Sequence, residues 1–141
     1  MQKSVWVLAG IIAAAVTVAA QVAVESLAKG DASGIQTARQ VVVRSDGEWQ
    51  ALWKMHAPDQ NAPGVDFNSK MVVGVFAGSK PSAGYAIEIV GARMQGMDLV
   101  VEYVERRPGR GQMQAQILIE PFHLVTVPKH SGPVRFLNVP G

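Results

Sequence analysis

The chain has 141 residues, of which 48% are hydrophobic, and a formal net charge of +2 at pH 7. This length suits one domain with an ordinary hydrophobic core. The basic residues are not clustered, so we expect no nucleic-acid partner. The absence of cysteine excludes a disulfide framework, a thiol nucleophile and a thiolate metal site.

The first two dozen residues have the composition of an export signal. Lys3 precedes an uncharged apolar run over residues 5–18, and small residues follow before the first polar position. This order is typical of a secretory signal peptide. We therefore expect residues 1–20 to be a signal peptide cleaved after Ala20, and the alternative is an uncleaved membrane anchor within residues 1–24. Both interpretations predict an exported protein, either periplasmic or secreted, with no other membrane contact.

Residues 21–37 are polar and rich in small side chains, which predicts a flexible tether or a loosely held first strand. Residues 38–141 carry the patterns of one folded domain. Three consecutive valines within residues 40–45 are typical of a buried strand.

A capping box predicts the helix. Ser45 is followed three residues later by Glu48, so the serine side chain can cap the helix while the glutamate reaches back to it. Apolar side chains then recur at helical spacing, with His56 last, and Pro58 ends the run. We expect a helix near residues 46–56 that packs Trp49 and Trp53 into the core.

The rest of the chain predicts strands. Residues 71–76 are apolar on both faces, as in a central strand. Alternation on both sides of Gln95-Gly96 predicts a hairpin. Further strands are expected at 113–119, 122–127 and 134–137. A mainly antiparallel sheet of about six or seven strands with one packed helix is an α+β fold.

No pattern in the chain indicates catalysis. The three histidines are widely spaced and no cluster of acidic residues accompanies them, so we predict no metal site, no cofactor and no catalytic residue. The chain is accordingly interpreted as a non-enzyme. The alternative, an uncharacterised hydrolase, requires Asp66, Glu88 and His123 to lie side by side.

Two loops are candidates for protein binding. The first loop is stiffened by a proline and ends at a glycine that permits positive φ, which favours a rigid binding loop, or else a tight structural turn with Tyr85 packed beneath it. The second is rich in arginine, which favours either solubility or the steering of an acidic partner. The candidate residues are Gly78, Ser79, Lys80, Pro81, Ser82, Ala83, Gly84 and Tyr85 in the first loop and Arg106, Arg107 and Arg110 in the second.

Several of these motifs occur together in a known family. They are Glu48-Trp49-x-x-Leu52-Trp53, Val65-Asp66-Phe67, Val72-Val73-Gly74-Val75-Phe76-x-Gly78, Pro81-x-x-Gly84-Tyr85, Arg107-Pro108-Gly109 and Pro121-Phe122-His123-Leu124-Val125. In these motifs the chain from Ser45 to Leu137 resembles the C-terminal domain of PrcB, a protease-complex subunit family. The resemblance implies an accessory or stabilising subunit of an envelope or secreted protease complex, with another exported protein as partner. It implies no catalytic residue.

A second resemblance concerns the first loop alone. The run Pro81-Ser82-Ala83-Gly84-Tyr85 is similar to the Pro-Thr-Thr-Gly-Tyr loop of chagasin-type inhibitors of cysteine peptidases. It implies an alternative function, a protease inhibitor acting through Lys80 to Tyr85. Lys80 stands where those inhibitors have asparagine, and Ser82-Ala83 replaces the threonine pair.

Overall fold

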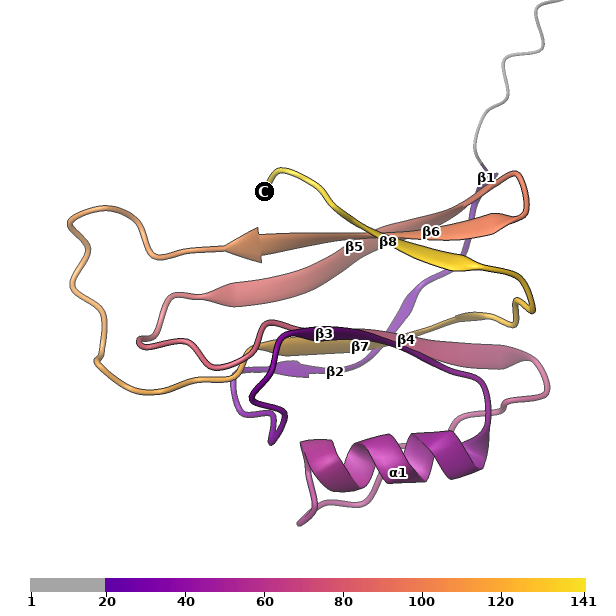
Figure 1. Ribbon diagram of the computed structural model, residues 1–141, viewed down its shortest axis with the longest axis horizontal. Coiled ribbons are helices and arrows are strands. Elements are labelled where there is room, and N and C mark those ends of the chain that lie inside the picture. Colours follow the sequence, from indigo (N-terminus) through magenta and orange to yellow (C-terminus); the bar gives the residue numbers. More distant parts are fainter. Residues whose placement is uncertain (1–19) are drawn as a thin grey trace, which may run out of the picture.

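The computed structural model describes residues 20–141, so the predicted export signal at residues 1–20, apart from Ala20 itself, lies outside the described part of the chain. This part contains eight strands and one helix (Figure 1). They are β1 (Ala20–Gln21), β2 (Glu25–Gly30), β3 (Arg39–Val43), α1 (Asp46–His56), β4 (Lys70–Phe76), β5 (Ala86–Gln95), β6 (Asp98–Arg106), β7 (Phe122–Pro128) and β8 (Val134–Asn138).

The strands form two four-stranded sheets that stack face to face, and α1 covers the outer face of one of them (Figure 1). The strand orders are β1-β5-β6-β8 and β2-β7-β4-β3. All neighbouring strands are antiparallel except β6 and β8, which are parallel. The predicted α+β class is confirmed. The number of strands is slightly higher than expected, and they divide between two sheets.

Two hydrophobic clusters hold these layers together. One lies between the sheets and includes Met71, Val73 and Val125, and the other lies between the second sheet and α1 and includes Val72 and Leu124. Strands β4 and β7 contribute to both clusters, because the sheet they belong to is covered on both faces. Their nearly continuous apolar runs follow from this position in the middle layer.

The helix begins where its capping box predicts. The Ser45 Oγ accepts a hydrogen bond from the Glu48 backbone N–H and donates one to the Glu48 carboxylate. Trp49 and Trp53 are buried against the sheet, and their indole N–H groups donate to loop carbonyls at Pro63 and Gln60. The predicted core role of both tryptophans is therefore confirmed. Among the described residues, no helix has the length and apolar character needed to cross a membrane.

The segment expected to be a tether or a loose strand contains β2. Residues 25–30 pair with β7 along the edge of the helix-covered sheet, with a register shift between Ser26 and Ala28. The strand interpretation, rather than the flexible tether, describes these residues. Their polar composition fits an edge strand, because one side of such a strand faces solvent.

Candidate protein-binding surface

The first candidate loop connects β4 in one sheet to β5 in the other, and backbone hydrogen bonds hold it in place. Ser79 N–H donates to the Gln36 carbonyl at 3.0 Å, and Lys80 exchanges two backbone hydrogen bonds with Ile119 at 2.8 and 3.0 Å. Ala83 N–H donates to the Ala115 carbonyl at 3.0 Å. The loop is therefore tied to two other segments along most of its length.

The second candidate loop lies against the first, at the end of the molecule on the left in Figure 1. Gly84 has φ +95°, as its position in the loop predicts. A Cβ atom added to Gly84 would lie 3.0 Å from side-chain atoms of both Pro108 and Gln114. We call residues 78–85 and 106–118 together the apical surface.

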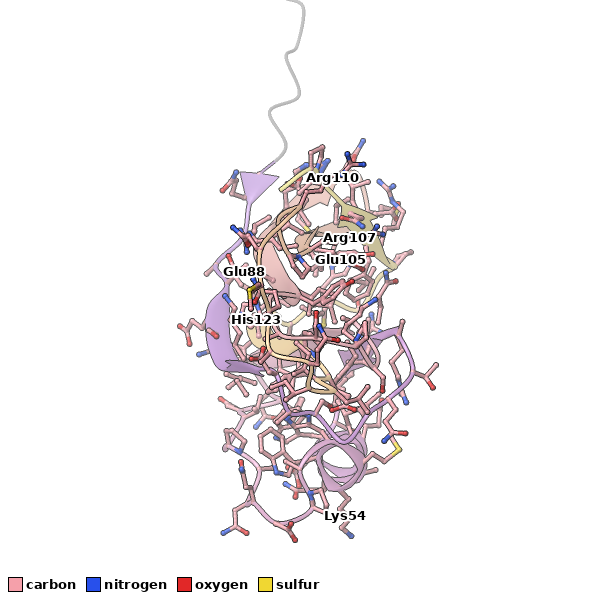
Figure 2. All side chains as sticks on the ribbon, turned by 90° about the vertical axis from the view of Figure 1, so that its left-hand side faces the viewer. Lys54, Glu88, Glu105, Arg107, Arg110 and His123 are labelled. Atoms are coloured by element: carbon pink, nitrogen blue, oxygen red, sulfur yellow. The ribbon has the colours of Figure 1, made fainter. Side chains whose placement is uncertain are left out.

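The apical surface is positively charged. Its residues include Lys80 and three arginines, and no aspartate or glutamate. Arg107 and Arg110 are exposed, and neither forms an ion pair within residues 20–141 (Figure 2). Arg106 approaches Glu88 only at 4.0 Å, while Glu88 also pairs with Lys29. The arrangement can attract an acidic partner, and such attraction weakens as salt is added.

The apical surface also exposes large apolar side chains, which corrects the strand predicted at 113–119. Met113 is 100% exposed, Ile117 is 53% exposed and Leu118 is 65% exposed. Only Ile119, at the end of the run, is buried, and it forms an isolated bridge with Lys80. Alternation indicates the side-chain period of a strand, but a strand also needs a regular neighbouring strand. Within the described residues this segment is hydrogen-bonded only to the irregular first loop, at Lys80 and Ala83.

The geometry of the first loop argues against insertion into a protease cleft. Ser82, in the middle of the loop, is buried, and the adjacent Ala83 is fastened to Ala115 behind it. Tyr85 is half-buried, and the Lys80 ammonium lies 5.7 Å from its ring centre. The turn therefore rests on the segment behind it and presents only part of its length to a partner.

The residues considered for hydrolase chemistry are only partly brought together. Glu88 and His123 both lie near Lys29, which pairs with Glu88 and faces His123 across β2 and β7 (Figure 2). Asp66 instead caps the turn before β4, where its carboxylate accepts hydrogen bonds from Asn68 N–H and the Ser69 hydroxyl. The arrangement required by the hydrolase alternative is therefore absent among these residues.

His123 has one defined protonation state. Its Nδ1 accepts a hydrogen bond from the backbone N–H of Ile89 at 2.9 Å, so this nitrogen carries no proton. The proton of the neutral ring is then on Nε2, which donates to the Ser26 Oγ at 2.9 Å. Burial, assisted by the nearby Lys29 charge, lowers the pKa of His123 to about 4. A base that activates a serine must accept the hydroxyl proton, so His123 in this state cannot activate Ser26.

His56 also fits a structural role. His56 is buried in the helix-side cluster, hydrogen-bonded through Nδ1 to the Ser33 Oγ at 2.8 Å, with its ring centre 4.2 Å from that of Phe122. Burial lowers the pKa of His56. Among residues 20–141, no three histidine, aspartate or glutamate side chains gather closely enough to hold a metal ion.

Sequence patterns missed two features of this region. The partners of His123 come from β2 and β5, far along the chain, so no local pattern indicates them. The exposed apolar side chains were misassigned to a strand, although Pro108 and Pro121 on either side of the segment favour irregular backbone.

Together the fold and this surface define a small α+β domain that presents two loops in contact with each other at one end. Residues 71–128, from β4 to β7, match the family model described as PrcB C-terminal. The predicted resemblance is thus confirmed, over a shorter segment than residues 45–137. The match includes both apical loops. No curated protein and no solved structure matches the chain significantly.

Proposed function

We propose that the protein is an exported, non-enzymatic binding domain that serves as an accessory subunit of an envelope or secreted protease complex. The composition of residues 1–20 supports export. The family match supports association with a protease complex. The observation that carries the binding role is the apical surface, where exposed Met113, Ile117 and Leu118 lie beside four cationic side chains.

Exposed apolar side chains on a solvent-facing surface favour binding of a partner that covers them. Each side chain loses contact with water on binding, which contributes roughly 25 cal/mol to the binding free energy for each Å² of apolar surface buried. The first loop loses little conformational entropy when a partner binds, because its backbone hydrogen bonds already order it. The partner chemistry that fits is an acidic surface with an apolar centre.

The test compares variants at the two ends of the molecule. In the Met113→Ser/Ile117→Ser variant, two exposed side chains change, so the fold should be unaffected. Met97, 81% exposed in the β5–β6 turn at the other end, supplies the matched control Met97→Ser. Crosslinked affinity capture from envelope extracts should recover the same exported partner with the wild type and the control, and lose it with the double variant.

The charge of the surface gives an independent measurement with the captured partner. Changing Arg107 and Arg110 to serine should slow association, and added salt should slow the wild type toward the same rate. A partner retained equally by the double variant, or an association rate insensitive to both arginines and salt, would contradict the proposal.

A further inference from the structure

Residues 112–118 of the second loop have the side-chain pattern of a strand but no second strand beside them in the described part of the chain (Figure 1). Met113, Ala115 and Ile117 form one row, and three glutamines alternate with them. Met113 is 100% exposed and Ile117 is 53% exposed. The apolar row therefore has no cover within the domain.

The hydrogen bonds to the first loop show which way the backbone of this segment faces. The Ala115 carbonyl accepts from the Ala83 N–H at 3.0 Å, and Ile119 is also hydrogen-bonded to the first loop. Successive residues of an extended chain turn their N–H and C=O groups to opposite edges, so those of Gln114 and Gln116 face away from that loop. Among the described residues, neither glutamine forms a backbone hydrogen bond. The outer edge of the segment therefore carries unused donors and acceptors.

The segment is complementary to itself in the antiparallel direction. When two copies are aligned about Ala115, Met113 lies opposite Ile117 of the second copy, and Gln114 lies opposite Gln116. The first pair joins two exposed apolar side chains on one face of the paired strands. The second pair joins the residues whose backbone groups face outward, so these groups can hydrogen-bond across the two copies.

Charges at the two ends of the segment match in the same alignment. Arg110 precedes the segment and Glu120 follows it, equally far from Ala115, so Arg110 of each copy faces Glu120 of the other. Neither side chain forms an ion pair in the described part of the chain. The Glu120 carboxylate accepts a hydrogen bond from the Ser79 hydroxyl at 3.2 Å. A two-fold interface repeats each contact, so this one match gives two ion pairs.

We propose that two copies of this chain pair through residues 112–118, as antiparallel strands related by a two-fold axis at Ala115. To pair, the segment has to straighten at Gln116, where the Ile117 N–H now donates back to the Ala115 carbonyl at 3.0 Å. The added strand then supplies the regular neighbour that the segment lacks. Because the interface is short, we expect a dimer that dissociates on dilution.

The charges favour a second copy over an acidic segment of another protein at this edge. An acidic segment would satisfy Arg110 but would bring like charge to Glu120, whereas a second copy satisfies both. Arg106 and Arg107 lie beyond the paired residues, so they stay available to an acidic partner. The inference goes beyond the proposed function and does not depend on it, because pairing requires no other protein.

The test is sedimentation velocity of the purified protein over a range of concentrations. Arg110→Glu and Glu120→Arg should each weaken the dimer by roughly tenfold, because like charges then face each other at both ends. A mixture of the two variants should dimerise like the wild type. In a mixed dimer the two altered side chains face each other, and the two unaltered ones keep their native pairing.

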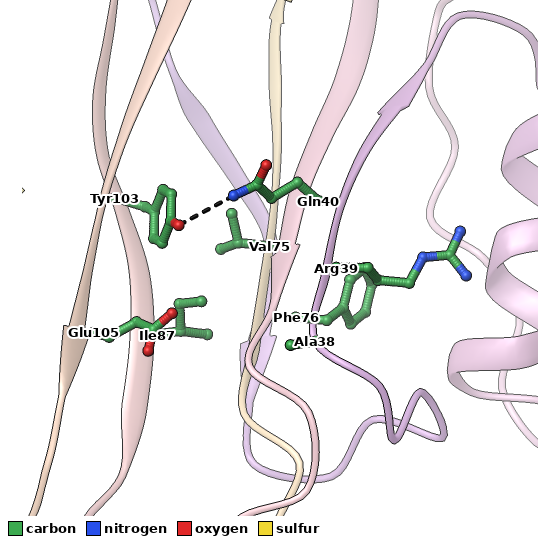
Figure 3. A pocket seen from close by; sticks show the side chains of 8 residues that line it. All are labelled: Ala38, Arg39, Gln40, Val75, Phe76, Ile87, Tyr103 and Glu105. Carbon is green, nitrogen blue, oxygen red and sulfur yellow. Dashed lines mark hydrogen bonds between the residues drawn. The ribbon is translucent and has the colours of Figure 1, made fainter. Parts of the chain in front are cut away.

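Two control variants make the same changes of charge outside the paired residues. Arg107→Glu and Glu105→Arg should dimerise like the wild type. Glu105 lines a cavity of about 290 Å³ between the two sheets, where Gln40 donates to the Tyr103 hydroxyl (Figure 3). Circular dichroism of every variant establishes that it is folded before its dimerisation is compared.

Hydrogen exchange gives a second measurement on the wild type. At concentrations where the dimer forms, the amides of Gln114 and Gln116 should exchange more slowly, while that of Ala115, which faces the first loop, should not change. A wild type that stays monomeric at millimolar concentration, or a mixture that dimerises as weakly as its components, would overturn the proposal. Sedimentation uses the protein alone, so its result is separate from the capture of a protease-complex partner.

Discussion

Replacing His123 by asparagine should remove much of the dependence of stability on pH between pH 6.5 and about 4. In the folded protein the ring accepts the Ile89 N–H, so protonation of Nδ1 would break that hydrogen bond and bury a charge near Lys29. The pKa of His123 accordingly lies near 4, below its ordinary value of 6.5. In that interval the unfolded chain binds a proton that the folded protein does not.

The direction and size of the change in the free energy of unfolding with pH follow from this difference in bound protons. The free energy of unfolding falls as the pH drops through 6.5, and the loss is complete near pH 4, below which both states are protonated at this residue. At roughly 1.4 kcal/mol for each pH unit, the contribution of His123 is at most about 3.5 kcal/mol. That is a large part of the roughly 5–15 kcal/mol that stabilises an ordinary domain.

The assay is urea unfolding followed by tryptophan fluorescence at several pH values, because Trp49 and Trp53 are buried in the folded state. His56 also has a lowered pKa and is present in both proteins, so the difference between the two curves isolates His123. Ser26→Ala, which removes only the hydroxyl that accepts from Nε2, should keep the pH dependence of the wild type. If the curves of wild type and His123→Asn run parallel from pH 7 to pH 4, the protonation state assigned to His123 is wrong.

Two further changes test the core and the apical surface. Trp49→Ala should lower the free energy of unfolding, measured with denaturant, by about 3–5 kcal/mol, because Trp49 is fully buried. The control Lys54→Ala, on the exposed side of the same helix, should change it by less than about 0.5 kcal/mol. Gly84→Ala should lower the melting temperature, because φ is +95° and the added methyl group would press on Pro108 and Gln114; an unchanged melting temperature would show that the two loops do not touch.

Features that depend on neighbours in the sequence could be predicted. The capping box at Ser45 and the helical spacing of Trp49 and Trp53 involve residues within one or two turns of each other, so the helix and its buried face followed from the sequence. The turn at Gly96, with φ +61°, and the alternation around it likewise defined the β5–β6 hairpin. The same kind of evidence indicated that Gly84 would adopt positive φ.

Features that depend on distant backbone could not be predicted in this way. Residues 113–118 have the side-chain alternation of a strand, yet they remain irregular because no strand lies beside them within the described residues. Residues 25–30 lack that alternation and nevertheless form β2, because β7 offers an edge to pair with. Strand formation is therefore decided by the neighbour as much as by the segment itself.

The candidate sites show the same difference between features set by neighbouring residues and features set by distant ones. Local composition identified the arginines and the stiffened loop of the apical surface, because charge, proline and glycine act within a few residues. The contact between the two loops and the protonation state of His123 each depend on segments that are far apart in the chain. Only the packing of the two sheets and the helix brings those segments together, so only the tertiary structure could decide them.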